Sequence, residues 1–327
     1  MLLALAVITG SGSAIADKPA DFDSQVASFA EEMQRKHGFD ASSLDRLLGP
    51  ARYRQSIIDA ITRPAEAKPW SQYRKIFVTD SRIRQGVEFW QANEALLGAA
   101  EREFGVPPEI IVAIIGVETR YGRHIGTYPV VDALTTLAFA YPKRSRFFTK
   151  ELEEFLLLSH EEQLQGTVVG SYAGAMGKPQ FIPSSYRAYA IDFDGDGQRN
   201  LWESNADVIG SVAAYFKRHG WQGGAPITGR ARGVNASHAG FVAAGMMPSI
   251  RLETLRAAGI GSDQPFADDA LASLIELDGD QGTEHWLGLH NFYVITRYNH
   301  SNLYAMAVHQ LSREILSERA RTGGATR

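Results

Sequence analysis

One apolar segment, PPEIIVAIIGVETRYGR at residues 107–123, constrains the fold of this chain more than any other. It opens with two prolines, which suit the first turn of a helix because the N–H group that proline lacks would have no partner there. Residues 110–117 carry no polar side chain, and a helix that is apolar on every face lies inside a protein. The segment therefore predicts a buried helix that stops at Gly122.

A single carboxyl group, that of Glu118, stands at the end of this apolar run. A carboxyl group in such surroundings must be paired with a cation or have its pKa raised. A carboxyl group that is still protonated near neutral pH can act as a general acid. From the segment alone two interpretations remain open: a structural ion pair with Arg120 or Arg123, and a catalytic acid.

The composition is that of a globular protein. The chain has 327 residues, 44% of them hydrophobic, which is enough for one large or two ordinary domains. The formal net charge is −4 and no long basic run occurs, so we expect no nucleic-acid partner. Cysteine is absent, which excludes disulfides, a thiol nucleophile and a thiolate-bound metal.

The first sixteen residues, MLLALAVITGSGSAIA, have the pattern of a signal peptide. A short apolar core precedes Ala14-Ile15-Ala16, which fits the small-x-small motif of a cleavage site, although no Lys or Arg precedes the core. The core is too short to span a bilayer, and no cysteine follows it that could carry a lipid. We expect an exported, soluble, periplasmic protein without a transmembrane segment or lipid anchor; the alternative is a buried N-terminal helix.

Apolar residues at helical spacing predict helices along most of the remaining chain. The expected helices cover residues 21–36, 44–48, 81–104, 130–140, 145–165, 206–219 and 302–316. The polar tail from Ser317 is expected to fray. From residue 223 to about 282 the sequence is punctuated by glycine and partly strand-like, which predicts a small mixed subdomain. The expected fold class is mainly α (α+β).

An acidic loop, DFDGDGQRNLW at residues 192–202, matches the spacing of an EF-hand cation loop. The matching positions are Asp192, Asp194, Asp196, Gly197, the backbone carbonyl of Gln198, and Glu203 at the twelfth position. Three carboxylates within five residues repel one another unless a hard cation neutralises them. We therefore expect a structural Ca²⁺ site, with Na⁺ as the alternative ion; a solvated acidic turn is the competing interpretation.

A second unusual loop, GSYAGAMGKPQFIPSSY at residues 170–186, places neutral amides and hydroxyls beside aromatic rings. This combination suits a sugar, which offers polar edges and an apolar ring face; a tight loop whose rings fill the core is the alternative. Motifs for other chemistries are missing from the sequence, namely H-E-x-x-H, G-x-S-x-G and G-x-G-x-x-G. We expect no organic cofactor.

Four motifs in order resemble the lytic murein transglycosylase B family. They are ETRYGR at 118–123, SYAGAMGKPQFIPSSY at 171–186, DFDGDGQRNLW at 192–202 and YNHSNLYAMAV at 298–308. The resemblance implies a core like that of goose-type lysozyme, an additional helical part and a small β-containing subdomain. The expected organisation is a signal peptide (1–16), a helical N-terminal part (17–105), a catalytic core (106–222) with its cation loop (192–207), a small mixed subdomain (223–285) and a C-terminal return to the core (286–327).

The resemblance also implies an activity, that of a peptidoglycan lytic transglycosylase, a carbon–oxygen lyase. Glu118 would be the sole acid/base: it would protonate the glycosidic oxygen between N-acetylmuramic acid and N-acetylglucosamine, and then deprotonate the muramoyl 6-hydroxyl, which forms a 1,6-anhydro end. Glycosidases that use water or a covalent intermediate need two carboxylates, whereas the segments around Glu118 offer one. A hydrolytic muramidase and a non-catalytic peptidoglycan-binding module are the alternatives.

The resemblance further implies roles for single residues. Four positions of the loop would line the cleft near the acid: Ser171, Met176, Gln180 and Phe181. Four aromatic positions would hold the glycan or the acid: Tyr73, Tyr215, Tyr298 and Tyr304. Arg144 matches a basic position that could meet the peptide stem. Asp207 matches the last acid of the family's cation site, so Glu203 and Asp207 compete for that place. The expected partners are peptidoglycan glycan strands, with other cell-wall enzymes as further candidates.

Overall fold

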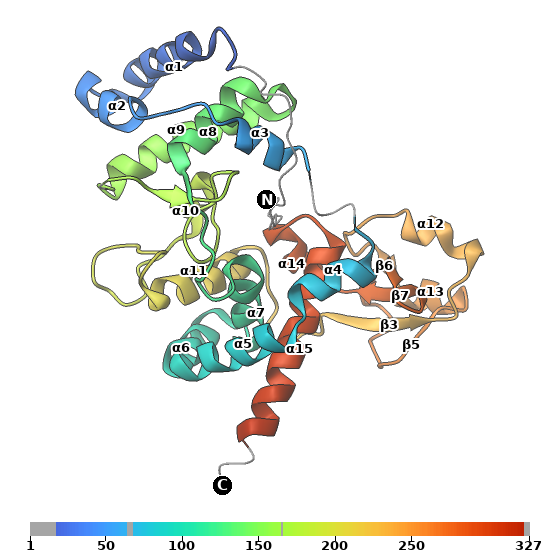
Figure 1. Ribbon diagram of the computed structural model, residues 1–327. Coiled ribbons are helices and arrows are strands. Elements are labelled where there is room, and N and C mark those ends of the chain that lie inside the picture. Colours follow the sequence, from blue (N-terminus) through green and yellow to red (C-terminus); the bar gives the residue numbers. More distant parts are fainter. Residues whose placement is uncertain (1–17, 64–67, 165, 324–327) are drawn as a thin grey trace. The chain divides into compact units, whose positions relative to one another are not determined.

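The computed structural model describes residues 18–63, 68–164 and 166–323 (Figure 1). The predicted signal peptide lies outside the described residues. Within them, helices dominate and strands form one five-stranded sheet and one two-stranded pair. This confirms a fold that is mainly α with a small β-containing part.

The chain divides into two compact units, each made of two stretches of sequence. Of the described residues, unit 1 contains 68–121 and 209–323, and unit 2 contains 18–63 and 122–208 without residue 165. The predicted domain boundaries follow the order of the sequence instead, and they stay a prediction.

Unit 2 is built from helices and the two-stranded pair. Its elements are α1 (Phe22–His37), α2 (Ala41–Leu48), α3 (Gln55–Ile61), β1 (Tyr128–Pro129), α8 (Val130–Ala140), α9 (Ser145–Glu161), β2 (Val169–Gly170) and α10 (Pro183–Tyr189), with a short 3₁₀ turn at Pro142–Arg144. Strands β1 and β2 pair antiparallel, with Tyr128 opposite Gly170. Helix α11 (Asn205–Arg218) begins in unit 2 and continues into unit 1.

Helix α8 forms the centre of unit 2 because its apolar residues recur at helical spacing. Val130, Ala133, Leu134 and Leu137 are all fully buried, and they follow the i, i+3, i+4, i+7 pattern of one helix face. The predicted helix over residues 130–140 is therefore confirmed. Helices α9, α1 and α3 pack against α8.

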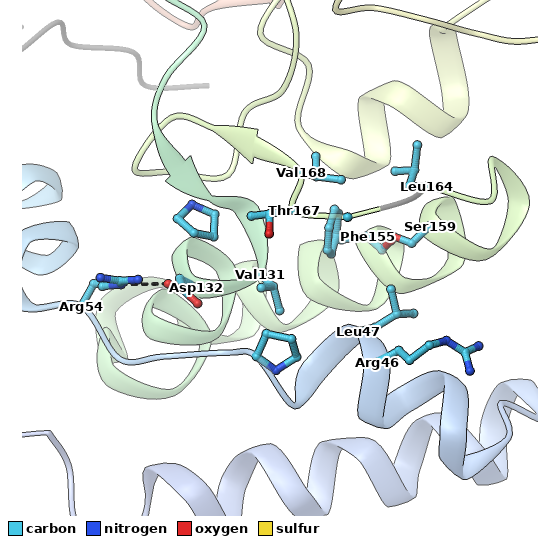
Figure 2. A pocket seen from close by; sticks show the side chains of 13 residues that line it. Arg46, Leu47, Arg54, Val131, Asp132, Phe155, Ser159, Leu164, Thr167 and Val168 are labelled. Carbon is cyan, nitrogen blue, oxygen red and sulfur yellow. Dashed lines mark hydrogen bonds and ion pairs between the residues drawn. The ribbon is translucent and has the colours of Figure 1, made fainter.

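One buried acid in α8, Asp132, ties the chain that connects α2 to α3 onto this helix. Asp132 is 2% exposed, and its two oxygens accept hydrogen bonds from the backbone N–H of Arg52 and from Nε of Arg54, each at 2.8 Å. The pair of Arg54 and Asp132 borders a cavity of about 190 Å³ between α2, α8 and α9 (Figure 2). None of the predicted site residues lines this cavity.

Unit 1 combines the helix of Glu118 with the larger sheet. Its helices are α4 (Trp70–Phe77), α5 (Asp80–Ala92), α6 (Glu94–Phe104), α7 (Pro108–Thr119), α12 (Ala239–Val242), α13 (Leu252–Ala257), α14 (His290–Tyr298) and α15 (Asn302–Gly323), and a 3₁₀ turn covers Ala236–His238. Helix α7 is buried from Ile110 through Thr119, with Pro108 in its first turn, as the sequence predicts. It packs between α5 and α15.

The structure corrects the single helix predicted over residues 81–104. The chain forms α5 and α6 instead, with a break at Asn93, whose φ is −125° and ψ 23°. The buried side-chain amide of Asn93 donates to the carbonyl oxygen of Phe89 at 2.8 Å. Asparagine ends helices in this way because its side chain competes with the backbone for hydrogen bonds.

The structure also corrects the frayed tail predicted from Ser317, because α15 continues to Gly323. Arg319 on this last part forms an ion pair with Glu94, and its guanidinium lies 4.7 Å from the centre of the Trp90 ring. Contacts with α5 and α6 therefore order a segment whose own composition is polar.

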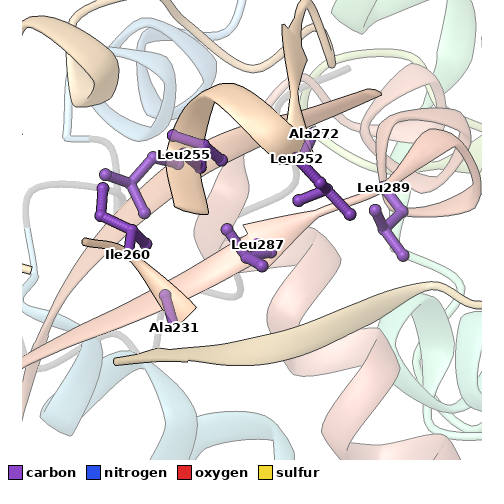
Figure 3. Close-up of a cluster of buried hydrophobic side chains, with 8 residues drawn as sticks. Ala231, Leu252, Leu255, Ile260, Ala272, Leu287 and Leu289 are labelled. Atoms are coloured by element: carbon purple, nitrogen blue, oxygen red, sulfur yellow. The ribbon is translucent and has the colours of Figure 1, made fainter. Parts of the chain in front are cut away.

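The five-stranded sheet accounts for the glycine-punctuated part of unit 1. Its strands are β3 (Thr228–Arg232), β4 (Ile250–Arg251), β5 (Gly261–Ser262), β6 (Leu271–Gly279) and β7 (Gly282–Gly288), in the antiparallel order β4-β6-β7-β3-β5. One face of the sheet buries Leu274 and Leu287 against Leu252 and Leu255 of α13 (Figure 3). The sheet therefore has a hydrophobic core of its own.

We expect that replacing Asp132 by alanine lowers the free energy of unfolding by about 2 kcal/mol, because two hydrogen bonds to a charged acceptor are lost. Urea unfolding followed by circular dichroism measures the change. Asp45→Ala, at an exposed position of α2, is the matched control and should change the stability by less than about 0.5 kcal/mol. Equal effects of the two substitutions would contradict the role of Asp132.

Candidate active site

Glu118 lies in the last turn of α7 and is 2% exposed. The hydroxyl of Tyr304, on α15, donates a hydrogen bond of 2.6 Å to Oε1 of Glu118. The second oxygen, Oε2, is buried and has no hydrogen-bond partner among the described residues. Burial raises the pKa of Glu118 to about 7, while the hydrogen bond from Tyr304 acts in the opposite direction. The group can therefore hold or release a proton near neutral pH.

The structure excludes a pairing of Glu118 with Arg120. Nε of Arg120 donates to Oε1 of Gln85 at 2.8 Å, and its Nη2 donates to Oγ of Ser81 at 3.2 Å. Among the described residues of unit 1, no basic side chain forms an ion pair with Glu118. The structural ion pair with Arg120 was therefore the wrong interpretation. Desolvation by burial is the main influence on the pKa of Glu118.

Three of the predicted tyrosines form an aromatic cluster next to the acid in unit 1. The rings of Tyr298 and Tyr304 are nearly parallel, with centres 6.4 Å apart. Tyr215 meets Tyr298 edge to face, with ring centres 4.8 Å apart, and its hydroxyl donates to the carbonyl oxygen of Arg297 at 2.5 Å. The structure thus brings Glu118, Tyr304, Tyr298 and Tyr215 together.

The fourth tyrosine, Tyr73, is 2% exposed on α4 and packs against Phe77. It lies near enough to Tyr304 to affect it electrostatically. Burial, followed by the proximity of Glu118, raises the pKa of Tyr304 and of Tyr298 far above the usual value. Both hydroxyls are therefore neutral near neutral pH, and Tyr304 meets Glu118 as a neutral donor.

The four loop residues predicted to contact sugar lie together in unit 2. Met176 and Phe181 exchange backbone hydrogen bonds of 2.8 and 3.1 Å, and both side chains are buried. Oγ of Ser171 accepts the backbone N–H of Ala175 at 3.1 Å. These contacts define a tight, ordered loop.

Gln180 occupies a left-handed conformation in this loop, with a φ of 55°, and is 1% exposed. Its side-chain Nε2 donates to the carbonyl oxygens of Ile125 at 3.1 Å and Gly177 at 2.9 Å. The amide nitrogen is therefore engaged in holding the loop.

Arg144 lies outside that loop, just before α9. Its guanidinium lies 4.2 Å from the ring centre of Phe147 and 5.2 Å from that of Phe148. Together with Lys143, Arg146 and Lys150 it lines an open, positively charged hollow of the surface. A hollow of this charge suits anionic groups.

The acidic loop brings its three aspartates together as the sequence predicts. Oxygens of Asp192, Asp194 and Asp196 lie within 4.8 Å of one another. Asp192 accepts backbone N–H groups from Gly195 at 2.7 Å and Gly197 at 2.8 Å, which folds the loop around its carboxylate. Gathered carboxylate oxygens form the hard donor set that Ca²⁺ prefers. The residues therefore fit a cation.

The two candidates for the last ligand of this loop differ in their surroundings. Asp207 is 1% exposed, and its oxygens accept the backbone N–H groups of Phe193 at 2.8 Å and Asn200 at 2.7 Å. Glu203 is exposed. Asp207 thus holds the backbone of the acidic loop through two hydrogen bonds. Both Asp207 and Glu203 remain candidates for the last cation ligand.

Within unit 2, the acidic loop contacts the loop of residues 170–186 that contains Gln180. The backbone N–H of Lys178 donates to the carbonyl oxygen of Leu201 at 2.8 Å, and Nζ of Lys178 donates to Oδ1 of Asn205 at 2.8 Å. Indole Nε1 of Trp202 donates to the carbonyl oxygen of Val169 at 3.4 Å. The two loops are therefore in direct contact at Lys178 and Leu201.

The sequence analysis assigns no role to Tyr121, whose hydroxyl donates to the carbonyl oxygen of Arg82 on α5 at 2.8 Å. The signal that could have found it is Gly116, a glycine in an otherwise bulky apolar helix, because such a glycine marks a close approach by another group.

In the part of the chain that the structure describes, no helix combines the length and the apolar character that crossing a bilayer requires.

Comparison with known proteins places these features in a family. Residues 21–313 match the model of the Transglycosylase SLT domain. The chain is 45% identical over 298 residues to the membrane-bound lytic murein transglycosylase B of Escherichia coli (strain K12), a match that covers 88% of this chain and 81% of the relative.

Two solved structures show the same fold. The soluble lytic transglycosylase SltB1 from Pseudomonas aeruginosa is 52% identical, with a TM-score of 0.85 and coverage of 90% of this chain and 99% of that chain. The Escherichia coli lytic transglycosylase Slt35, solved in complex with calcium, is 44% identical, with a TM-score of 0.82 and coverage of 90% and 93%. These likenesses confirm a lysozyme-like helical core. The chain therefore belongs to the lytic murein transglycosylase B family, whose members are lyases that act on peptidoglycan.

Proposed function

We propose that Glu118 is the sole catalytic acid/base of this peptidoglycan lytic transglycosylase. The enzyme cleaves the β-1,4 bond between N-acetylmuramic acid and N-acetylglucosamine and leaves a 1,6-anhydromuramic acid end. One observation carries the proposal: Glu118 is buried, its pKa is raised to about 7, and only one of its oxygens has a partner among the described residues. A carboxyl group with these properties suits both a proton donor and a proton acceptor.

In the first half of the reaction, protonated Glu118 gives its proton to the glycosidic oxygen. The bond from that oxygen to the anomeric carbon breaks, and positive charge develops on the sugar. Oε2 of Glu118 is the atom suited to this step, since Oε1 already accepts the hydrogen bond from Tyr304. Tyr304 then stabilises the carboxylate that the transfer leaves behind.

In the second half, the carboxylate of Glu118 takes the proton of the muramoyl 6-hydroxyl. The oxygen of this hydroxyl forms the new bond to the anomeric carbon, and Glu118 ends the cycle protonated. No water is consumed, so a second carboxylate to activate water is not required. In unit 1, the described neighbours of Glu118 that titrate are tyrosines, which agrees with a reaction that needs one acid.

We infer that the loop of Ser171, Met176, Gln180 and Phe181 contacts the glycan strand. Hydroxyl and amide groups held beside buried aromatic and thioether side chains suit a ring that is polar at its edges and apolar on its faces. Arg144 and its basic hollow suit the carboxylates of a peptide stem. Other enzymes of the cell wall are candidate protein partners.

We further infer that the acidic loop binds one Ca²⁺ ion, for which Na⁺ could substitute. The gathered oxygens of Asp192, Asp194 and Asp196 support this, as does the relative Slt35, which was solved in complex with calcium. The backbone carbonyl of Gln198 and a carboxylate of Glu203 or Asp207 would complete the ligands. The ion would stabilise the loop and take no part in the chemistry.

We also propose that the protein acts in the periplasm. The first sixteen residues have the pattern of a signal peptide, and the proposed substrate is the peptidoglycan outside the cytoplasmic membrane.

Glu118→Gln should abolish cleavage, because the amide neither donates a proton to the glycosidic oxygen nor accepts one from the 6-hydroxyl. Digestion of purified cell-wall sacculi followed by mass spectrometry measures the products. The unaltered protein should release anhydromuropeptides. Reducing muropeptides would indicate a hydrolytic muramidase, and no release a non-catalytic binding module.

The same substitution should stabilise the protein at pH 8 and leave its stability unchanged below about pH 4.5. The folded pKa of Glu118 is about 7 against an ordinary value of 4.5, so the folded state binds the proton more tightly. The stability that this provides is complete at low pH and is lost as the pH rises through 7. The difference corresponds to about 3 kcal/mol. Thermal unfolding at both pH values checks this, and a pH-independent difference would count against the raised pKa.

Addition of Ca²⁺ after chelation should raise the melting temperature, because the ion binds only the folded loop. Asp194→Asn should remove most of this increase. Glu203→Gln and Asp207→Asn, measured by the same titration, identify the last ligand: the substitution that weakens Ca²⁺ affinity more marks it. The absence of any Ca²⁺ effect on the unaltered protein would reject the site.

A further inference from the structure

The turn that follows Glu118 contains two residues other than glycine in the left-handed region. Arg120 has a φ of 51° and Tyr121 a φ of 61°. For a residue with a Cβ atom this conformation is unfavourable, because the Cβ atom comes too close to the following carbonyl oxygen. It persists only where the surrounding contacts enforce it. The contacts of these two residues are therefore the reason why α7 ends as it does.

The side chain of Tyr121 folds back from this turn onto α5. Its hydroxyl donates to the backbone carbonyl oxygen of Arg82 at 2.8 Å. Its ring stacks on Phe89 of the same helix, with ring centres 5.6 Å apart and an angle of 28° between the planes. Tyr121 thus links the end of α7 to α5 through both its ring and its hydroxyl.

Two glycines make room for this ring. A Cβ atom at Gly116 of α7 would lie 2.6 Å from the hydroxyl oxygen of Tyr121 and 2.7 Å from its Cζ. A Cβ atom at Gly86 of α5 would lie 2.6 Å from the same hydroxyl oxygen and 2.6 Å from Cδ1 of Ile315, on α15. Three helices, α5, α7 and α15, therefore meet at the tip of the Tyr121 side chain.

Arg120 ties the same turn to α5 through Gln85 and Ser81. The backbone N–H groups of Arg120 and Tyr121 donate back into α7, to the carbonyl oxygens of Gly116 at 3.1 Å and Ile115 at 3.2 Å. Side-chain hydrogen bonds thus attach the last turn of α7 to α5, and backbone hydrogen bonds to α7 itself complete that turn.

Glu118 lies on this turn, two residues after Gly116 and three before Tyr121. Its carboxyl group meets Tyr304 of α15, and α15 touches Gly86 through Ile315. A shift of α7 along α5 would change the distance between the oxygens of Glu118 and Tyr304, and it would change how deeply Glu118 is buried.

We propose that Tyr121 is a positioning residue for the catalytic acid. The Tyr121 ring lies between Gly86 and Gly116. It holds the last turn of α7 in the position in which Glu118 is buried and accepts the hydrogen bond from Tyr304. The proposal rests on the proposed role of Glu118 as acid/base. Tyr121 acts through α7 and takes no part in the proton transfer.

Few titratable groups surround this arrangement in the described residues of unit 1. Tyr304 on α15 and Tyr298 on α14 face Glu118, and Tyr73 on α4 faces Tyr304. Arg82 and Arg120 face Tyr121. His309 on α15 and His219, which stacks on Tyr215, also titrate, and burial lowers the pKa of both. The carbon-13 signal of the Glu118 carboxyl group, read beside the pH profile, therefore identifies the group that titrates.

The test is Tyr121→Ala, assayed with soluble peptidoglycan strands over a range of pH. We expect kcat to fall at least tenfold while KM changes less than threefold. The alkaline limb of the pH profile should move to lower pH, because a Glu118 exposed to water loses its proton earlier. Carbon-13 titration of the Glu118 carboxyl carbon without substrate should show the same fall in pKa.

Three further variants separate positioning from general destabilisation. Tyr121→Phe keeps the ring and should keep kcat within threefold and the alkaline limb in place. Leu97→Ala, at a fully buried position of α6, should lower the melting temperature without moving that limb. If Tyr121→Ala does not fold, Gly116→Ala displaces the ring while Tyr121 is retained, and it should lower the pKa of Glu118 in the carbon-13 titration.

The positioning role is overturned if Tyr121→Ala, or Gly116→Ala in its place, gives the same pH profile and carbon-13 titration as Leu97→Ala. Inactivity of Glu118→Gln would still stand in that case. If Glu118→Gln instead retains cleavage, the proposed acid is wrong, and the carbon-13 titration alone decides whether Tyr121 sets the burial of Glu118.

Discussion

The removal of one carboxyl group from water is the interaction on which the site depends. Helix α7 places Glu118 next to buried apolar side chains, and it contains no basic residue that could pair with the carboxyl group. Desolvation favours the protonated form of an acid, so the pKa rises to the range in which the same group can give and take a proton. A surface carboxyl group would be ionised throughout that range and could not begin the reaction as an acid.

The other buried acids in the described part of the chain show how Glu118 differs from a structural carboxylate. Asp132, Asp207 and Glu151 each accept hydrogen bonds on both oxygens, in every case with backbone N–H groups among the donors. Asp132 and Asp207 fasten loops to helices, and Glu151 fastens the first turn of α10 to α9. Glu118 accepts one hydrogen bond, from a neutral tyrosine, and its other oxygen has no partner among the described residues. A buried polar atom without a partner is unfavourable for folding, and such cost is retained where function requires it.

The packing of the turn that follows Glu118 explains how this unfavourable arrangement persists. Helices α5, α7 and α15 meet where Gly86 and Gly116 leave room for Tyr121, and two residues in left-handed conformations close the turn. Close packing makes such a junction resistant to sliding. Unit 2 uses another device: the acidic loop packs against the loop of Gln180, so a bound cation would order both segments.

The sequence determined the features that depend on local chemistry. Prolines followed by eight apolar residues suffice to specify a buried helix, and alternating aspartates before a glycine suffice to gather carboxylates. Local pattern also placed Glu118 at an apolar helix end. It did not decide whether the carboxyl group pairs with a cation or has no ionic partner. Tertiary structure decided that question, because Arg120 turns to Gln85 and Ser81 and Tyr304, 186 residues away along the chain, supplies the hydrogen bond. Tertiary contacts with Glu94 and Trp90 likewise decided the ordered end of α15. The break at Asn93 is local instead, because its side-chain amide binds the carbonyl oxygen of Phe89 one turn earlier. Spacing along a sequence reports which face of an element is apolar, whereas the pKa of a buried acid depends on atoms that only folding brings next to it.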